Sequence, residues 1–120
     1  PDVLVPAYDD AAGVTAACNL YLLTRLNREL GADFDLGAFR HRAVWNAPES
    51  RIEMHLVSQR PQTVRVAGRS FDFAEGETIH TENSRKIAMD VFAGLAEQAG
   101  WRIETRWTDA RGYFAMMYLV

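Results

Sequence analysis

The spacing of apolar residues predicts helices in the first third of the chain. A stripe of apolar side chains spaced four apart predicts one long helix and comprises Val14, Cys18, Leu22, Leu26 and Leu30. Asp9 and Asp10 are candidates for its N-cap, and Gly31 is placed to end it in a left-handed conformation. Asp35 is a candidate cap for a second, shorter helix that runs through Arg40 and His41.

From residue 51 the apolar period changes from four to two, which predicts strands. Ile52, Met54 and Leu56 would share one face of a first strand, and Glu53 and His55 would lie on the other. Further extended segments, separated by turn residues, are predicted at 62–67, 70–73 and 78–84. The middle of the chain is therefore expected to be rich in antiparallel strands.

The last third of the chain predicts a helix and two strands. The helix covers residues 89–99 and stops at Gly100, and the first strand covers 101–107. After a turn, the almost unbroken apolar run 113–120 is typical of a strand buried on both faces of a helix-covered sheet. Because the chain supplies only one neighbour for this strand, we expect part of its sheet to lie outside the chain.

Composition narrows the class of protein. The 120 residues are 48% hydrophobic and 24% charged, which is ordinary for a globular domain. A net charge of −3 gives no electrostatic reason to expect nucleic acid or an anionic membrane as partner. Cys18 is the only cysteine and lies in the apolar stripe, so we expect it to be buried, and a reducing cytoplasm fits best.

Candidate chemistry is sparse. The three histidines, His41, His55 and His80, lack the spacing of a zinc motif, and no glycine-rich phosphate loop is present. The run IHTENS at 79–84 places five successive polar side chains between a strand-like and a helical region. From the pattern alone, this run is either a solvated loop that caps the next helix or a cluster of donors and acceptors around a small polar ligand. Tyr8 is either a core residue or a pocket hydroxyl.

Ten segments, in one order along the chain, carry a resemblance to a known family. They are AYDDAAGVTAA (7–17), NL (19–20), LNREL (26–30), FRH (39–41), VWN (44–46), SRIEMHL (50–56), VRV (64–66), IHTENS (79–84), AGW (99–101) and WTD (107–109). They resemble the histidine-specific, S-adenosylmethionine-dependent methyltransferases of ergothioneine biosynthesis. The chain departs from them at Arg85, where many relatives have an aromatic or small residue.

The resemblance implies a fold and a domain organisation. The chain is similar to the C-terminal portion of these α/β enzymes, and this portion by itself would be α+β. It would contain most of the family-specific substrate-binding domain and the end of a class I methyltransferase sheet. It implies a helical linking segment at 1–43, a β-rich substrate-binding region at 44–86, and a helix with the last two methyltransferase strands at 87–120. S-adenosylmethionine would be bound mainly by the missing N-terminal methyltransferase region, and the exposed sheet edge invites self-association.

The resemblance also implies a substrate site for histidine. Tyr8 resembles the tyrosine that binds the substrate carboxylate, Glu82 and Ser84 resemble the pair that binds the imidazole, and Met54 resembles a methionine in the same pocket. No metal or catalytic side chain is implied. Two alternatives remain open: a non-catalytic small-molecule-binding module of the same fold, and a methyltransferase of the family that acts on another amino acid or amine.

Overall fold

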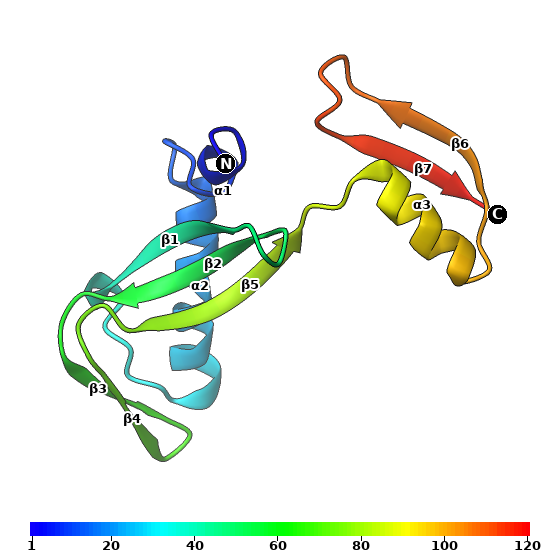
Figure 1. Ribbon diagram of the computed structural model, residues 1–120. Coiled ribbons are helices and arrows are strands. Elements are labelled where there is room, and N and C mark those ends of the chain that lie inside the picture. Colours follow the sequence, from blue (N-terminus) through cyan, green and yellow to red (C-terminus); the bar gives the residue numbers. More distant parts are fainter. The chain divides into compact units, whose positions relative to one another are not determined.

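Helices and antiparallel strands are mixed along the chain, which makes it an α+β structure (Figure 1). The computed structural model describes all residues, Pro1–Val120, and they form two units, Pro1–Arg85 and Lys86–Val120. The elements are α1 (Leu4–Tyr8), α2 (Val14–Leu30), a 3₁₀ helix η1 (Leu36–Ala38), β1 (Phe39–Asn46), β2 (Arg51–Ser58), β3 (Gln62–Val66), β4 (Arg69–Phe73), β5 (Thr78–Arg85), α3 (Met89–Gln98), β6 (Ile103–Thr108) and β7 (Ala115–Leu119).

The long helix α2 ends where the sequence predicts but begins later, because Gly13 is its N-cap residue and Val14 its first residue. The carboxylate of Asp10 accepts hydrogen bonds from the backbone N–H groups of Val14 and Thr15, at 3.1 and 2.9 Å. Hydrogen bonds from Thr15 and Val14 lower the pKa of Asp10 to about 2. At the other end Gly31 has a φ of 59°, a left-handed conformation that costs glycine little. The predicted stop at Gly31 is confirmed, whereas the N-cap is Gly13 and not Asp9 or Asp10, although the Asp10 carboxylate does bind the first turn.

The predicted apolar stripe of α2 is wrong. Val14 is 68% exposed, and Cys18, Leu22 and Leu30 are exposed as well. The helix instead buries Leu23, with Leu20 and Leu26 packed partly against the same cluster. Residues four apart turn about 400° around a helix, so a strict spacing of four winds off any single face by about 40° a step. The interpretation of Cys18 as a buried residue fails for the same reason.

Three strands form the main sheet of the first unit, in the order β1-β2-β5, all antiparallel. Strand β1 corrects the predicted second helix, because Arg40 and His41 lie in this strand. Asp35 does cap a helix, but that helix is only the single 3₁₀ turn η1. Burial alternates along the start of β1, with Phe39 and Ala43 inward and the intervening Arg40 outward, so the period there is two.

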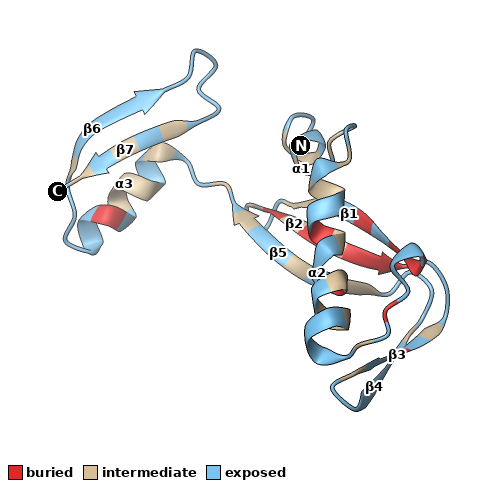
Figure 2. Cartoon of the chain, turned by 180° about the vertical axis from the view of Figure 1, so that it is seen from behind, coloured by how far each residue is buried: buried red, intermediate tan, exposed pale blue.

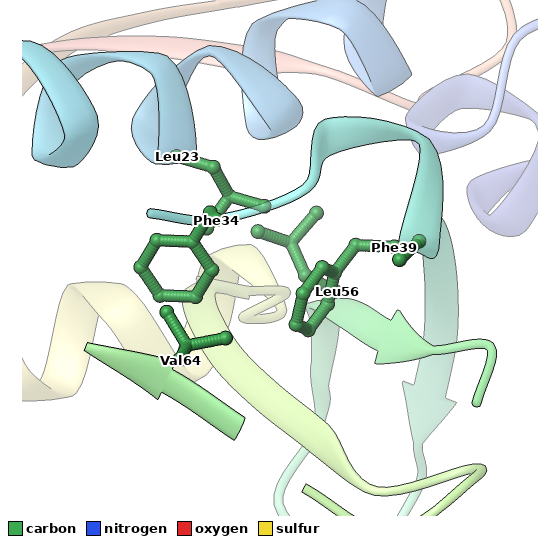
Figure 3. Close-up of a cluster of buried hydrophobic side chains, with 6 residues drawn as sticks. Leu23, Phe34, Phe39, Leu56 and Val64 are labelled. Atoms are coloured by element: carbon green, nitrogen blue, oxygen red, sulfur yellow. The ribbon is translucent and has the colours of Figure 1, made fainter. Parts of the chain in front are cut away.

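The core of the first unit lies between α2, the sheet and the β3-β4 hairpin (Figures 2 and 3). Its buried members are Leu23, Phe34, Ala38, Phe39, Leu56 and Val64. The Phe39 ring makes edge contacts with Phe34 and Phe73, with ring centroids 5.6 and 5.5 Å apart. In β2, Ile52, Met54 and Leu56 face inward together, which confirms the predicted alternation. The helix and the three-stranded sheet thereby share one apolar layer.

The second unit consists of α3 and the β6-β7 hairpin. The predicted helix, its stop at Gly100 and both strands are present. The prediction that the last strand is buried on both faces is wrong within this chain, since Phe114, Met116 and Tyr118 are exposed. A two-stranded hairpin has no third strand on either outer edge, and Ala96 is the only buried residue of α3. The unit therefore keeps a large apolar surface uncovered.

Candidate functional site

Two of the four candidate substrate residues meet directly. Tyr8 lies at the end of α1 and Ser84 near the end of β5, 76 residues apart in sequence. Their hydroxyl oxygens are 2.8 Å apart, and both side chains are partly buried. The contact crosses from the N-terminal helix to the last strand of the sheet. The fold thus brings together two residues that sequence spacing alone could not connect.

The strand register places the other two candidates beside them. Met54 in β2 pairs with Glu82 in β5, and Ile52 pairs with Ser84. Directly opposed residues of an antiparallel pair point to the same face of a sheet. Met54, Glu82 and Ser84 therefore share the face on which Ile52 is buried. Met54 is only 9% exposed and Glu82 is exposed, so an apolar wall lies next to an accessible carboxylate.

The pairing of β2 with β5 is irregular next to Met54. The pairing between β2 and β5 shifts between Met54 and His55, which leaves Thr81 as an extra residue in β5. The Thr81 hydroxyl donates a hydrogen bond to the carbonyl of Met54, at 3.0 Å. Bulges of this kind change the direction of neighbouring side chains and are frequent near binding sites. Because of the shift, His55 pairs with His80 and not with Thr81.

A second cluster, which the sequence did not reveal, lies on the opposite face of the sheet. It is centred on Glu53, whose carboxylate accepts hydrogen bonds from Asn46 at 2.8 Å, from Arg51 at 2.9 Å and from the Nε2–H of His55 at 2.9 Å. These bonds, with that of Asn46 first, lower the pKa of Glu53 to about 2. Glu53 is held ionised in this network at any ordinary pH.

His55 and His80 stack within this cluster, with ring centroids 4.5 Å apart and planes at 22°. With Glu53 they offer three ligand atoms within 4.8 Å of one another. The atoms already have partners, however: Thr78 lies 3.2 Å from His55 Nδ1 and Asn83 lies 2.6 Å from His80 Nε2. A cation would have to displace these partners beside the Arg51 guanidinium, which repels it. We therefore assign the cluster to the hydrogen-bonded framework of the sheet.

The sequence signal for this cluster was the alternation itself. Glu53 and His55 were expected on one face of β2, and both lie there with about 12% of the side chain exposed. The alternation could not predict which strand would pair with β2 and complete the cluster. His80 arrives opposite His55 only through the β2-β5 pairing, 25 residues along the chain.

The comparison with protein families covers the entire chain. Residues 1–120 match the sequence model of the family described as "Histidine-specific methyltransferase, SAM-dependent". The chain belongs to this family. Its resemblance at the segments around Tyr8, Met54, Glu82 and Ser84 thus extends over the full length of both units.

Two curated methyltransferases are similar to the chain. One, "Histidine N-alpha-methyltransferase" of Mycolicibacterium smegmatis (strain ATCC 700084 / mc(2)155), is 53% identical in an alignment of 120 positions that covers 98% of this chain. The other, "Histidine N-alpha-methyltransferase" of Mycobacterium tuberculosis (strain CDC 1551 / Oshkosh), is 44% identical in an alignment of 115 positions that covers 94% of this chain. The chain spans 37% and 36% of the lengths of these two relatives.

Membership of a SAM-dependent family implies use of S-adenosylmethionine. The residues present here do not fit the glycine-containing loop expected to hold it. The one helix that follows a strand is α3, and residues 86–88, which connect it to β5, contain no glycine. Gly13 precedes α2, but it follows the helix α1. The helices, for their part, are all too short or too polar to cross a membrane.

Proposed function

We propose that the full-length protein transfers methyl groups from S-adenosylmethionine to the α-amino nitrogen of histidine. The product would be N-α-trimethylhistidine, as in ergothioneine biosynthesis, and this chain would supply substrate recognition. The observation that carries the proposal is the gathering of Tyr8, Met54, Glu82 and Ser84 on one face of the sheet. Family membership and the names of the two relatives support the reaction.

Glu82 and Ser84 have the chemistry to recognise an imidazole. A neutral imidazole has one N–H donor and one ring-nitrogen acceptor. The carboxylate of Glu82 can accept from the first, and the hydroxyl of Ser84 can donate to the second. The two residues are two apart on β5, so their side chains point to the same face. An apolar amino acid that covered these groups would leave them without a partner, at a cost of about 1–3 kcal/mol, so the pair would discriminate against apolar amino acids.

Tyr8 and Met54 would complete the site around the rest of the substrate. A carboxylate only accepts hydrogen bonds, so the Tyr8 phenol would donate to it. The Tyr8 and Ser84 hydroxyls bond each other, and each has one proton, so both would donate to the substrate only if their mutual hydrogen bond opens on binding. Met54 has an unbranched, polarisable side chain, and its burial beside Glu82 suits an adaptable apolar wall. Together these residues would hold the amine in a fixed orientation, which is the main requirement for an in-line methyl transfer.

Replacing Glu82 tests this proposal directly. We expect Glu82→Ala in the full-length enzyme to raise the Kd for histidine at least about tenfold, the effect of losing one charge-assisted hydrogen bond. Binding of S-adenosylhomocysteine should change little. Isothermal calorimetry with each ligand measures both, and Asn83→Ala is the matched control, because Asn83 is the next residue of β5 and pairs with Glu53 on the opposite face.

The same calorimetry separates the proposal from its alternatives. Unchanged histidine binding in Glu82→Ala would remove Glu82 from the site. A panel of amino acids tests the substrate, since tighter binding of another amino acid or amine would reassign it. Ligand binding by a full-length protein that transfers no methyl group would favour a non-catalytic module.

We also infer that residues 87–120 are the end of a class I methyltransferase sheet and that 1–43 and 44–86 are linking and substrate-binding regions. The exposed side chains of Met116 and Tyr118 in the apolar strand β7 support this, because strands inside such a sheet are apolar on both faces. A structure of the full-length enzyme in which β7 lies at a solvent-exposed, unpaired position would contradict it.

A further inference from the structure

A buried hydrogen-bonded relay reaches Tyr8 from the main sheet. His41 in β1 is 8% exposed, and its Nε2 lies 2.7 Å from the backbone carbonyl of Tyr8. Its Nδ1 lies 2.9 Å from the side-chain amide nitrogen of Asn19, which is itself buried on α2. The same amide nitrogen donates to the backbone carbonyl of His55 in β2, at 3.3 Å.

These contacts determine where the protons lie. A carbonyl oxygen only accepts, so His41 must carry its proton on Nε2 to donate to Tyr8. The carbonyl of His55 likewise requires the Asn19 nitrogen, not its oxygen, at that position. The second N–H of that amide then donates to Nδ1 of His41. Every group of the relay therefore has one consistent role, and β2, α2, β1 and α1 are joined in series.

The helix that carries Tyr8 is short and contributes no buried residue, although the Tyr8 hydroxyl also bonds Ser84. It is only five residues long, buries no residue and has no side-chain hydrogen bond at its N-cap. A single turn of helix is not stable by itself in water. Tyr8 is its last residue, and the carbonyl that His41 binds belongs to that residue.

We propose that His41, with Asn19 behind it, is a positioning residue for the substrate site. Resting on the proposed function above, the inference is that His41 holds the backbone of Tyr8 so that the phenol is directed at the substrate carboxylate beside Ser84. A displacement of about 1 Å in such a group is enough to cost a large factor in substrate use. His41 does not contact the substrate in this scheme and acts only through Tyr8.

The test compares His41→Leu, His41→Gln and Tyr8→Phe in the full-length enzyme. We expect His41→Leu to raise the Kd for histidine at least about tenfold, the effect of one lost buried hydrogen bond. We expect S-adenosylhomocysteine to bind as before. His41→Gln restores part of the affinity, because the terminal amide of glutamine can place an N–H near the position of Nε2.

A double-mutant cycle distinguishes positioning from a general loss of stability. In Tyr8→Phe the phenol is already absent, so adding His41→Leu should change the Kd for histidine by much less than in the parent. Ser58→Ala is the control for burial, since Ser58 is a fully buried polar residue at the other end of β2 whose hydroxyl bonds Arg60 and Gln62 and not the site. It should leave histidine binding unchanged.

Additive effects in the cycle, or equal losses in Ser58→Ala, would overturn the inference. If His41→Leu does not fold, Asn19→Ala replaces it in the same cycle, and an additive result there is equally decisive.

Failure of this inference can be distinguished from failure of the proposed function. Loss of histidine binding in Glu82→Ala and Tyr8→Phe, with none in the His41 variants, rejects the relay and keeps the site. No loss in Glu82→Ala or Tyr8→Phe rejects the site itself.

Discussion

Glu53 shows how one carboxylate can link the stability of this sheet to pH. Its pKa is about 2 in the folded chain, against 4.5 for an unperturbed glutamate, because Asn46, His55 and Arg51 all donate to it. A depressed folded pKa means that the ionised network stabilises the fold fully above about pH 4.5. That contribution is lost as pH falls from there toward 2.

We therefore expect Glu53→Gln to lower the Tm of the full-length protein most clearly at neutral pH. Between pH 4.5 and 2 the difference in Tm from the parent should shrink, because the parent loses the same network by protonation. Thermal unfolding followed by circular dichroism across this range is the measurement. Glu75→Gln, at an exposed turn position, is the control. A difference in Tm that stays constant with pH would contradict the assigned cause.

At the scale of single residues, the sequence predicted local backbone roles better than it predicted burial or long-range contacts. Gly31 was found as the stop of α2, and Asp10 as a residue that binds its first turn, because both roles depend on local backbone geometry. Cys18 was misplaced because burial depends on which helix face meets the sheet. His41 was identified only as one of three scattered histidines, and its contact with Tyr8 spans 33 residues.

Among the elements, α2 gives the sharpest test of which face is buried. Leu22 and Leu23 are neighbours in sequence, but Leu22 is exposed and Leu23 is fully buried in the core cluster. We expect Leu23→Ala to lower the free energy of unfolding by about 2–5 kcal/mol, since it removes buried methyl groups and leaves a cavity.

Leu22→Ala should cost within about 0.5 kcal/mol, as is usual for surface substitutions. Urea denaturation of the 120-residue chain, with both variants at the same protein concentration, measures the two values. Equal losses of unfolding free energy in the two variants would contradict the observed packing face and favour the predicted stripe.

The strands followed the sequence closely because a period of two is a local signal. Strands β2 to β5 begin and end within a residue or two of the predicted segments. Strand β1 was missed because its start was assigned to the Asp35 helix, although Phe39, His41 and Ala43 do alternate with polar residues. The bulge opposite Met54 had no local signal, because it exists only in the pairing of two strands.

For the whole molecule, the two units differ in how much they bury. Ten of the eleven buried hydrophobic residues lie in Pro1–Arg85, and the remaining one is Ala96. We expect amide hydrogen exchange of the 120-residue chain to be slow in β1 and β2 and fast in β6 and β7, because local stability follows buried apolar contacts. Mass spectrometry of exchanged peptides measures this.

Comparable protection in both units would contradict that expectation. The full-length enzyme provides the comparison: if residues 87–120 belong to a larger sheet, exchange in β6 and β7 should slow markedly there while that of β2 changes little.

What the sequence determined by itself was local: the end of α2, the alternation of β2, the turns, the α+β content and the family resemblance. These depend on backbone preferences and on residues close together in the chain. Only the tertiary structure decided that Tyr8 meets Ser84, that Glu82 faces Met54, and that His41 reaches the carbonyl of Tyr8. Each of these contacts joins residues from different elements. They are set by strand register and by the face on which α2 packs, which no local pattern encodes.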